Sequence, residues 1–213
     1  MNKRIIWLID ENERQSRTYV NQLRMMLPNS ITVEPIFPPY RQKADYLPVL
    51  DDPETVCFVI DQKLKDTGIA TYTGIELAQY LRGINRKIPI YILTNYAQQQ
   101  DQFVEGEWSV EEIISKGSLC DDRQSQITKA RIIRRIDVYE DILGEREKRF
   151  SQLLRKSLND ELNEAELQEL EQLQFERTAP TLASEVAELS QLEKLTKINQ
   201  ALLDHLTQTT GDV

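Results

Sequence analysis

Five polar residues of this 213-residue chain are candidates for chemistry, because each comes directly after a short, mostly apolar run. Such runs, bounded by turn residues, are typical of buried strands. In an open parallel sheet, ligands bind outside the carboxyl ends of the strands. Polar groups at these positions are therefore candidate site residues: Asp10, Glu11, Asp61, Thr94 and Lys116.

Three of the five are carboxylates, which repel each other at close range unless a cation neutralises them. Hard oxygen ligands with room for water suit Mg²⁺. The hydroxyl of Thr94 and the ammonium of Lys116 could then hold the oxygens of a phosphoryl group placed on one carboxylate. The alternative is that these acids are turn and helix-cap residues. The occurrence of all five residues in this order along the chain favours a binding site over the turn-and-cap alternative.

The elements that would position these residues alternate between strands and helices, which is typical of βαβ units on a parallel sheet. The sequence predicts an α/β fold with a five-stranded, doubly wound sheet. The expected strands are 5–9, 31–36, 56–60, 88–93 and 113–115, and the expected helices are 19–27, 40–50, 75–83 and 97–104.

Composition changes near residue 122. Only one of the eight prolines lies beyond it, in a stretch rich in strong helix formers. We expect a mixed domain at 1–122 and an all-helical extension at 123–213. The extension is predicted to contain helices at about 122–158, 163–176 and 181–207, with a break at Thr178–Pro180. Such helices can form a small bundle, or a coiled coil that dimerises through the first of them.

The first 122 residues resemble the receiver domain of two-component response regulators. The order and spacing of several short motifs carry the resemblance: Ile9-Asp10-Glu11-Asn12-Glu13, Val59-Ile60-Asp61, Thr73-Gly74-Ile75-Glu76-Leu77, Ile88-Pro89-Ile90-Tyr91-Ile92-Leu93-Thr94 and Ser115-Lys116.

The resemblance implies that Asp61 accepts a phosphoryl group from a histidine kinase or a phosphotransfer protein. It implies Mg²⁺ held by Asp10, Glu11, Asp61 and the main-chain carbonyl of Lys63. Thr94 and Lys116 would bind the phosphoryl group, while Lys63 and Tyr96 would tune its lifetime. Enzymatic activity would be limited to self-phosphorylation and self-dephosphorylation, and the helical extension would pass on the signal through protein contacts or dimerisation.

Four features depart from the family pattern. The loop between Asp61 and Gly74 is longer than usual. Gly117 stands where a proline usually follows the lysine, and Ile113 where an aromatic residue is common. Asn95 replaces the small residue that usually follows the threonine. A non-catalytic pseudo-receiver that serves as an adaptor or scaffold therefore remains an alternative function.

Charge and composition argue against other functions. A net charge of −9 disfavours nucleic acid as the main partner. The basic run at 123–135 is interpreted as a solvated or docking face. The single histidine, His205, lacks the flanking residues of a phosphotransfer site, and with two cysteines it makes a zinc site untenable. No apolar run is long enough for a membrane span or a signal peptide, so we expect a cytoplasmic protein.

Overall fold

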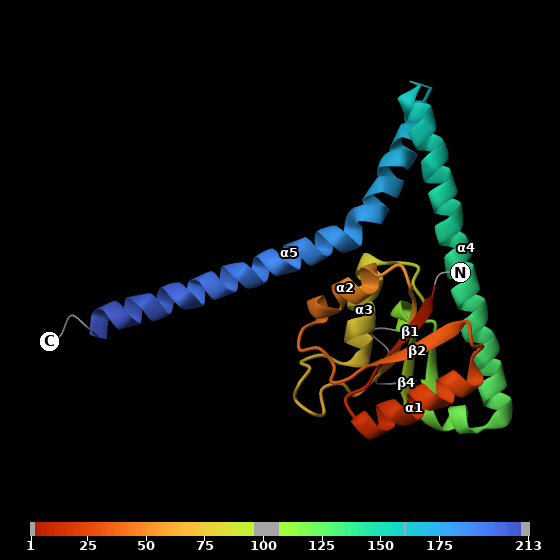
Figure 1. Cartoon of the computed structure of the whole chain (residues 1–213), viewed down its shortest axis with the longest axis horizontal. Coiled ribbons are helices and arrows are strands. Elements are labelled where there is room, and N and C mark those ends of the chain that lie inside the picture. The colour runs from red at the N-terminus through yellow and green to blue at the C-terminus, as the bar shows by residue number, and fades with distance from the viewer. Residues whose placement is uncertain (1–2, 96–106, 160, 210–213) are drawn as a thin grey trace.

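The computed structural model of the chain describes residues 3–95, 107–159 and 161–209. Its strands and helices follow one another along the chain in an alternating order (Figure 1). They are β1 (Arg4–Ile9), α1 (Glu13–Met26), β2 (Ile31–Ile36), η1 (Lys43–Tyr46), α2 (Leu47–Asp51), β3 (Thr55–Asp61), α3 (Gly74–Ile84), β4 (Ile90–Thr94), η3 (Glu107–Ser109), β5 (Glu112–Ser115), η4 (Lys116–Cys120), α4 (Asp122–Leu158) and α5 (Glu164–Thr209).

The five strands form one parallel sheet in the order β2-β1-β3-β4-β5. This is the order of doubly wound flavodoxin-like folds, CheY among them. It confirms the predicted fold class, and all five predicted strands are present within a residue or two. The helix predicted at 97–104 and the tuning residue Tyr96 lie outside the described residues.

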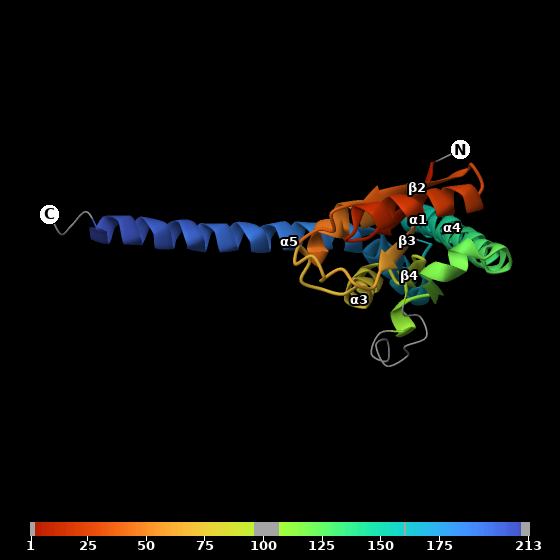
Figure 2. The same cartoon turned by 90° about the horizontal axis from the view of Figure 1, so that it is seen from below.

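Helices cover both faces of the sheet (Figure 2). On one face, α1 and the first half of α4 pack against alternate strand residues, with Val20, Leu23, Ile132 and Ile136 buried. On the other face lie η1, α2, α3 and the loop at 62–73. Strand β3 is buried along its whole length, which explains its uninterrupted apolar run. The apolar cores on the two faces fix the strands in place, and because the strands are parallel, their carboxyl ends lie along the same side of the sheet.

Helix α4 belongs to both parts of the molecule. Ile132 and Ile136 are fully buried against the sheet and Tyr139 packs into the opposite core, whereas the helix continues without a break to Leu158. The hydroxyl of Tyr139 also accepts a hydrogen bond from the side chain of Asn85, at 2.9 Å. The predicted boundary at residue 122 stays a prediction, but side chains of the sheet's core extend to Tyr139.

We therefore expect a chain that ends at Asp122 to be unfolded and a chain that ends at Gly144 to fold. Loss of each fully buried isoleucine costs about 2–5 kcal/mol, so removing Ile132 and Ile136 together costs about 4–10 kcal/mol, which is comparable to the whole stability of an ordinary domain, about 5–15 kcal/mol. Circular dichroism during urea unfolding measures this directly. A cooperative transition in the shorter chain would show that α4 is dispensable for the fold.

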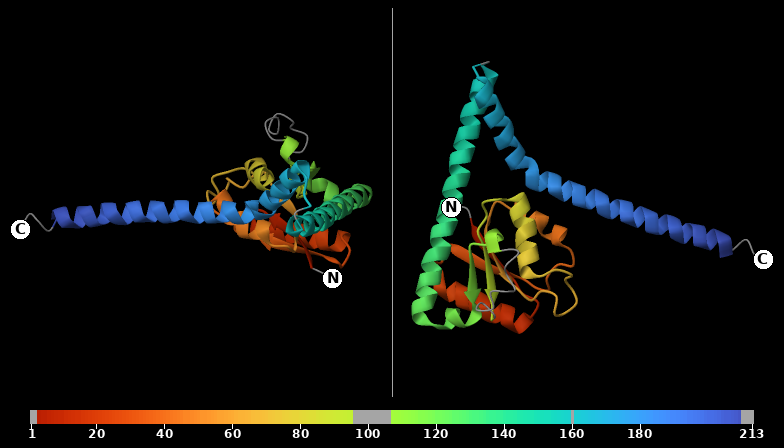
Figure 3. Two further views of the ribbon diagram at one scale, coloured as in Figure 1. Left: turned by 90° about the horizontal axis from the view of Figure 1, so that it is seen from above. Right: turned by 180° about the vertical axis from the view of Figure 1, so that it is seen from behind.

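The second half of the chain consists of two long helices that meet in a narrow V (Figures 1 and 3). Near the apex, Arg149 pairs with Glu169 at 2.6 Å, and Lys156 pairs with Glu166 at 2.6 Å. Helix α5 then crosses α2 and α3 and projects away from the rest of the protein (Figure 2). Instead of the two helices predicted at about 163–176 and 181–207, the structure has a single helix, α5.

The break predicted at Thr178–Pro180 is absent because a proline inside a helix removes one backbone hydrogen bond and can kink the helix without ending it. Helix α5 is visibly bent in its first half (Figure 1). Two residues before the proline, the hydroxyl of Thr178 donates to the carbonyls of Gln174 and Phe175, at 3.1 and 3.2 Å.

Among the described residues, no helix is both long and apolar enough to cross a lipid bilayer.

Candidate functional site at the carboxyl edge of the sheet

The sheet brings four of the five predicted residues into contact. Asp10 follows β1, Asp61 ends β3 and Lys116 follows β5, so all three lie at the same edge. Oxygen atoms of Asp10, Glu11 and Asp61 lie within 4.8 Å of one another. Thr94 is buried at the end of β4. Strand β4 pairs with β3, and Asp61 lies opposite Leu93, the residue that precedes Thr94.

Lys116 is the centre of this cluster. Its Nζ lies 2.9 Å from Asp61 Oδ1, 3.2 Å from Asp10 Oδ2 and 2.8 Å from Gln15 Oε1. An ammonium has three protons to donate, so these three acceptors use its whole capacity. The lysine and both aspartates are buried, so the ion pairs are shielded from water. Lys116 therefore has no proton left for Glu11.

Backbone groups fix the two aspartates. The amide of Asn12 donates to Asp10 Oδ1 at 2.8 Å, in the turn that begins α1. The amide of Lys63 donates to Asp61 Oδ2 at 3.2 Å. The carboxylates are thus positioned by the ends of their own strands and not by flexible neighbours, which is the arrangement expected of a preorganised site.

The electrostatics of the cluster are unbalanced. With all three carboxylates ionised, one ammonium leaves two negative charges in a buried region. Burial, a hydrogen bond with Asp61 and the charges of both aspartates raise the pKa of Glu11 to about 8. Burial also raises the pKa of Asp10, although Lys116 opposes it. Burial lowers the pKa of Lys116, but the attraction of Asp61 and Asp10 outweighs this effect and raises it.

A divalent cation fits this imbalance. Glu11 Oε2 is buried and has no hydrogen-bond partner among the described residues, although a buried carboxylate oxygen normally has one. The available ligands are carboxylate oxygens, which Mg²⁺ prefers. A bound Mg²⁺ would supply the two missing positive charges and a partner for Glu11.

Mg²⁺ is accordingly expected to stabilise the protein against thermal unfolding, by about 2.7 kcal/mol when its concentration is a hundred times its Kd. Glu11→Gln should abolish this stabilisation while leaving the metal-free protein as stable as the wild type or more so, because an amide there avoids the unfavourable ionisation that raises the pKa of Glu11 to about 8. Glu13→Gln, two residues along and paired with Arg17 at the surface, is the control and should respond to Mg²⁺ like the wild type. An equal Mg²⁺ response in Glu11→Gln would show that the metal binds elsewhere.

The structure also shows two site residues that the sequence analysis missed. Gln15 contacts Lys116 from the first turn of α1, the helix capped by Asn12. Gly74 begins α3 directly against Asp61, where an added Cβ would lie 2.3 Å from the carbonyl oxygen of Asp61. The helix predicted at 19–27 gave no signal for the first, because Gln15 lies in the first turn only when α1 begins at Glu13, as the structure shows. A glycine at the start of a helix gave only a weak signal for the second.

The enlarged loop at 62–73 is anchored to the core, because Leu64, Ala70 and Tyr72 are buried. Its last residue, Thr73, caps α3 in a reciprocal arrangement with Glu76, and the backbone amide of Thr73 helps to lower the pKa of Glu76 to about 2. Lys63, at its start, is partly exposed, with Nζ 3.8 Å from Asp66 Oδ2.

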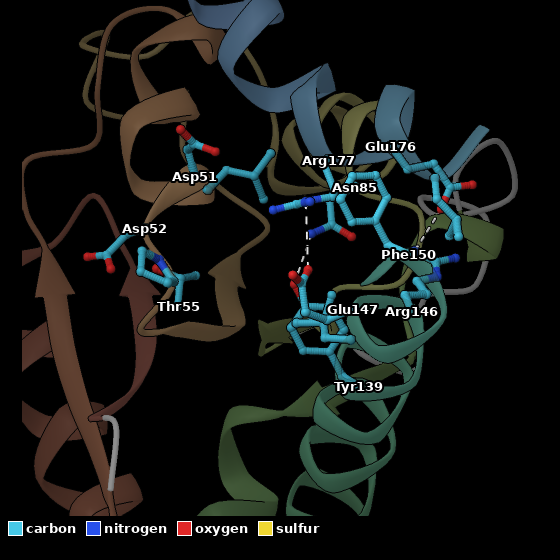
Figure 4. A pocket seen from close by; sticks show the side chains of 14 residues that line it. Asp51, Asp52, Thr55, Asn85, Tyr139, Arg146, Glu147, Phe150, Glu176 and Arg177 are labelled. Atoms are coloured by element: carbon cyan, nitrogen blue, oxygen red, sulfur yellow. Dashed lines mark hydrogen bonds and ion pairs between the residues drawn. The ribbon is translucent and has the colours of Figure 1, made fainter. Parts of the chain in front are cut away.

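A separate cavity of about 200 Å³ lies at the other end of β3, near Thr55 (Figure 4). Its polar side chains are largely engaged with one another: Arg177 stacks over Phe150 at 4.2 Å and pairs with Glu147, and Arg146 pairs with Glu176. Figure 4 shows these groups bridging α4 and α5. We therefore interpret the cavity as a gap in the packing between the sheet domain and helices α4 and α5.

The basic run in the first half of α4 is partly neutralised. Arg131 pairs with Glu112, and Arg135 with Glu111, which also pairs with Arg82 at 3.0 Å. These acids lie at the start of β5 and just before it. The run thus helps to dock α4 on the sheet of its own chain, whereas its interpretation as a face that docks a partner stays a prediction.

No protein-family model matches this sequence, and no curated protein sequence matches it. Solved structures do. A sensor protein from Polaromonas is 15% identical, with a TM-score of 0.49, over 64% of this chain and 98% of the other. A response regulator receiver domain protein from Clostridium thermocellum is 12% identical, with a TM-score of 0.48, over 65% and 98%. The response regulator TrrA from Thermotoga maritima, solved with Mg²⁺ and BeF, is 14% identical, with a TM-score of 0.45, over 59% and 97%. At these identities the likeness concerns the fold alone.

Proposed function

We propose that this protein is a phosphorylatable receiver that takes a phosphoryl group on Asp61 from a histidine kinase or a phosphotransfer protein. One observation carries the proposal: the buried Asp61 carboxylate contacts the Lys116 ammonium at 2.9 Å and has carboxylate oxygens of Asp10 and Glu11 within 4.8 Å. A nucleophile, a fixed cation and two further metal ligands are the groups that phosphoryl transfer to a carboxylate requires.

In the proposed reaction, a carboxylate oxygen of Asp61 attacks the phosphorus of a phosphohistidine. An O–P bond forms, the P–N bond breaks, and the histidine nitrogen keeps the electron pair and takes up a proton. Lys116 and Thr94 bind the transferred phosphoryl oxygens. Asp10, Glu11 and Asp61 would hold a Mg²⁺ ion, which would supply positive charge beside the transferring group.

The output is proposed to run through the helices. Lys116 is the first residue of η4, which leads directly into α4, so a new bond at Lys116 acts on the start of the helix that carries the extension. Beyond the crossing, α5 exposes more than half of several apolar side chains to solvent: Leu189, Leu192, Leu195 and Ile198. Such a face suits contact with a protein partner or dimerisation, and we propose that a cytoplasmic partner docks there.

The proposal is tested by phosphoryl uptake. The full chain is incubated with Mg²⁺ and acetyl phosphate, and its intact mass is followed for the wild type and for Asp61→Asn. We expect the mass of one phosphoryl group on the wild type alone. Equal labelling of both would move the acceptor elsewhere. No labelling of either would favour a pseudo-receiver that serves as an adaptor.

A further inference from the structure

An open hollow of about 490 Å³ lies where α5 crosses the sheet domain, away from the Asp10 cluster. Three separate segments form it: the residues around the start of η1, the end of the 62–73 loop with α3, and the middle of α5. None of its lining residues is acidic, and three are cationic. The side chains that matter are Arg41, Lys43, Thr71, Tyr72, Tyr80 and Lys194.

Among the described residues, none of the three cations is held in a close ion pair, although the Asp45 carboxylate lies near enough to act on Tyr72 and Tyr80. Within the described parts of the chain, neither Arg41, Lys43 nor Lys194 forms an ion pair. This is notable in a protein with a net charge of −9. The three cations that line the hollow repel one another, and an anion bound between them would offset this repulsion by attracting all three.

The floor of the hollow is rigid. The Tyr72 hydroxyl donates to the carbonyl of Tyr40, and the rings of Tyr46 and Tyr72 pack edge to face at 6.4 Å. Lys43 Nζ lies 5.8 Å from the centre of the Tyr80 ring, which limits the positions of the ammonium. A ligand held there would meet a surface that is largely formed in advance, so little ordering would oppose binding.

We propose that this hollow binds the phosphate group of a small molecule, with Arg41 and Lys43 on one side and Lys194 of α5 on the other. A phosphate carries up to two charges and at least three acceptor oxygens, so cations from different segments can approach it together. A carboxylate offers one charge and two oxygens. The volume is that of a small-molecule site and leaves room for the group that bears the phosphate.

Binding at this place fastens α5 to the sheet domain. Near this place α5 also contacts the sheet domain through Ala183 and Ala187, which are partly buried against the core. A bound phosphate would join Lys194 to Thr71 and Tyr72, in the loop that starts next to Asp61. The inference does not depend on phosphorylation of Asp61, because none of the lining residues belongs to that site.

Isothermal titration of the full chain with inorganic phosphate, pyrophosphate or AMP, in a chelator that keeps Mg²⁺ away from the acidic cluster, tests the proposal. We expect binding by the wild type, and a loss of affinity of about tenfold or more in both Lys43→Glu and Lys194→Glu, as for a lost charge-assisted hydrogen bond. Lys197→Glu, three residues farther along α5 and outside the lining, is the matched control and should bind like the wild type.

The choice of probe separates the sources of the phosphate. Tighter binding of AMP than of inorganic phosphate would identify a phosphoester ligand, and equal binding would identify free phosphate; both support the site. Circular dichroism confirms that the variants are folded. No binding of any probe at millimolar concentration, or equal losses in Lys194→Glu and Lys197→Glu, would overturn the proposal.

Discussion

Replacing Gly74 by alanine is expected to lower the free energy of unfolding by about 3 kcal/mol and to impair the site at the same time. The new Cβ would lie 2.3 Å from the carbonyl oxygen of Asp61 and 3.0 Å from the Cα of Gln62. Both are backbone atoms, so no flexible side chain can give way. Overpacking of this kind costs about 1–3 kcal/mol or more, because the start of α3 and the end of β3 must move apart. Urea unfolding followed by circular dichroism measures the loss.

The same helix provides a control. An added Cβ at Gly83 meets nothing within 4 Å, so Gly83→Ala should stabilise α3 by about 0.5–1 kcal/mol through helix propensity. Opposite signs at the two glycines are the expected pattern. If Gly74→Ala were as stable as the wild type and still responded to Mg²⁺, the close approach between α3 and Asp61 would have no role.

Replacing Lys116 by methionine is expected to destabilise the protein by about 3–5 kcal/mol, as for other buried ion pairs that lose one partner. The variant keeps the length of the side chain but leaves Asp10 and Asp61 buried without their common cation. Mg²⁺ should recover more stability in this variant than in the wild type, because the metal then replaces the ammonium. Thermal unfolding with and without Mg²⁺ provides the measurement.

Lys65→Met is the matched control for the loss of a lysine near the site. Lys65 pairs with Glu76 at 2.9 Å, but both side chains are more than 40% exposed. An exposed pair contributes about 1 kcal/mol or less, so this variant should unfold almost like the wild type. Similar losses in the two variants would mean that the burial of Lys116 does not strengthen its ion pairs.

The strands and their polar ends could be predicted from the sequence because both depend on local signals. A continuous apolar run such as Val56–Ile60 reveals a buried strand, and the parallel order then brings Asp61 beside Asp10 and Lys116. The closeness of three carboxylates, on which the expectation of Mg²⁺ rested, follows from the topology. These parts needed no knowledge of side-chain packing.

Other features depend on contacts between distant segments, for which the sequence has no local signal. The approach of Gly74 to Asp61 appears only once α3 is placed against β3. The role of Gln15 requires the end of β5 to lie beside the start of α1. Pro180 was taken as a helix end because a local rule favours that reading, whereas in the structure the flanking turns continue the helix.

The extension shows the same limit. Its apolar stripe predicted one long first helix correctly, since α4 runs from Asp122 to Leu158. The stripe could not show that the first half of this helix covers the sheet while the second half pairs with α5, because both surroundings require the same spacing of apolar residues. The ion pairs of Arg149 and Lys156 with α5 show how the second half is held.

Phosphorylation of Asp61 is tested most directly by locating the phosphoryl group itself. The wild-type chain is treated with Mg²⁺ and acetyl phosphate and then with hydroxylamine, which converts an acyl phosphate into a stable hydroxamate, and the digested protein is mapped by peptide mass. We predict a hydroxamate on the peptide that contains Asp61 and on no other. A hydroxamate at a different carboxylate, or none in protein shown to bind Mg²⁺, would contradict it.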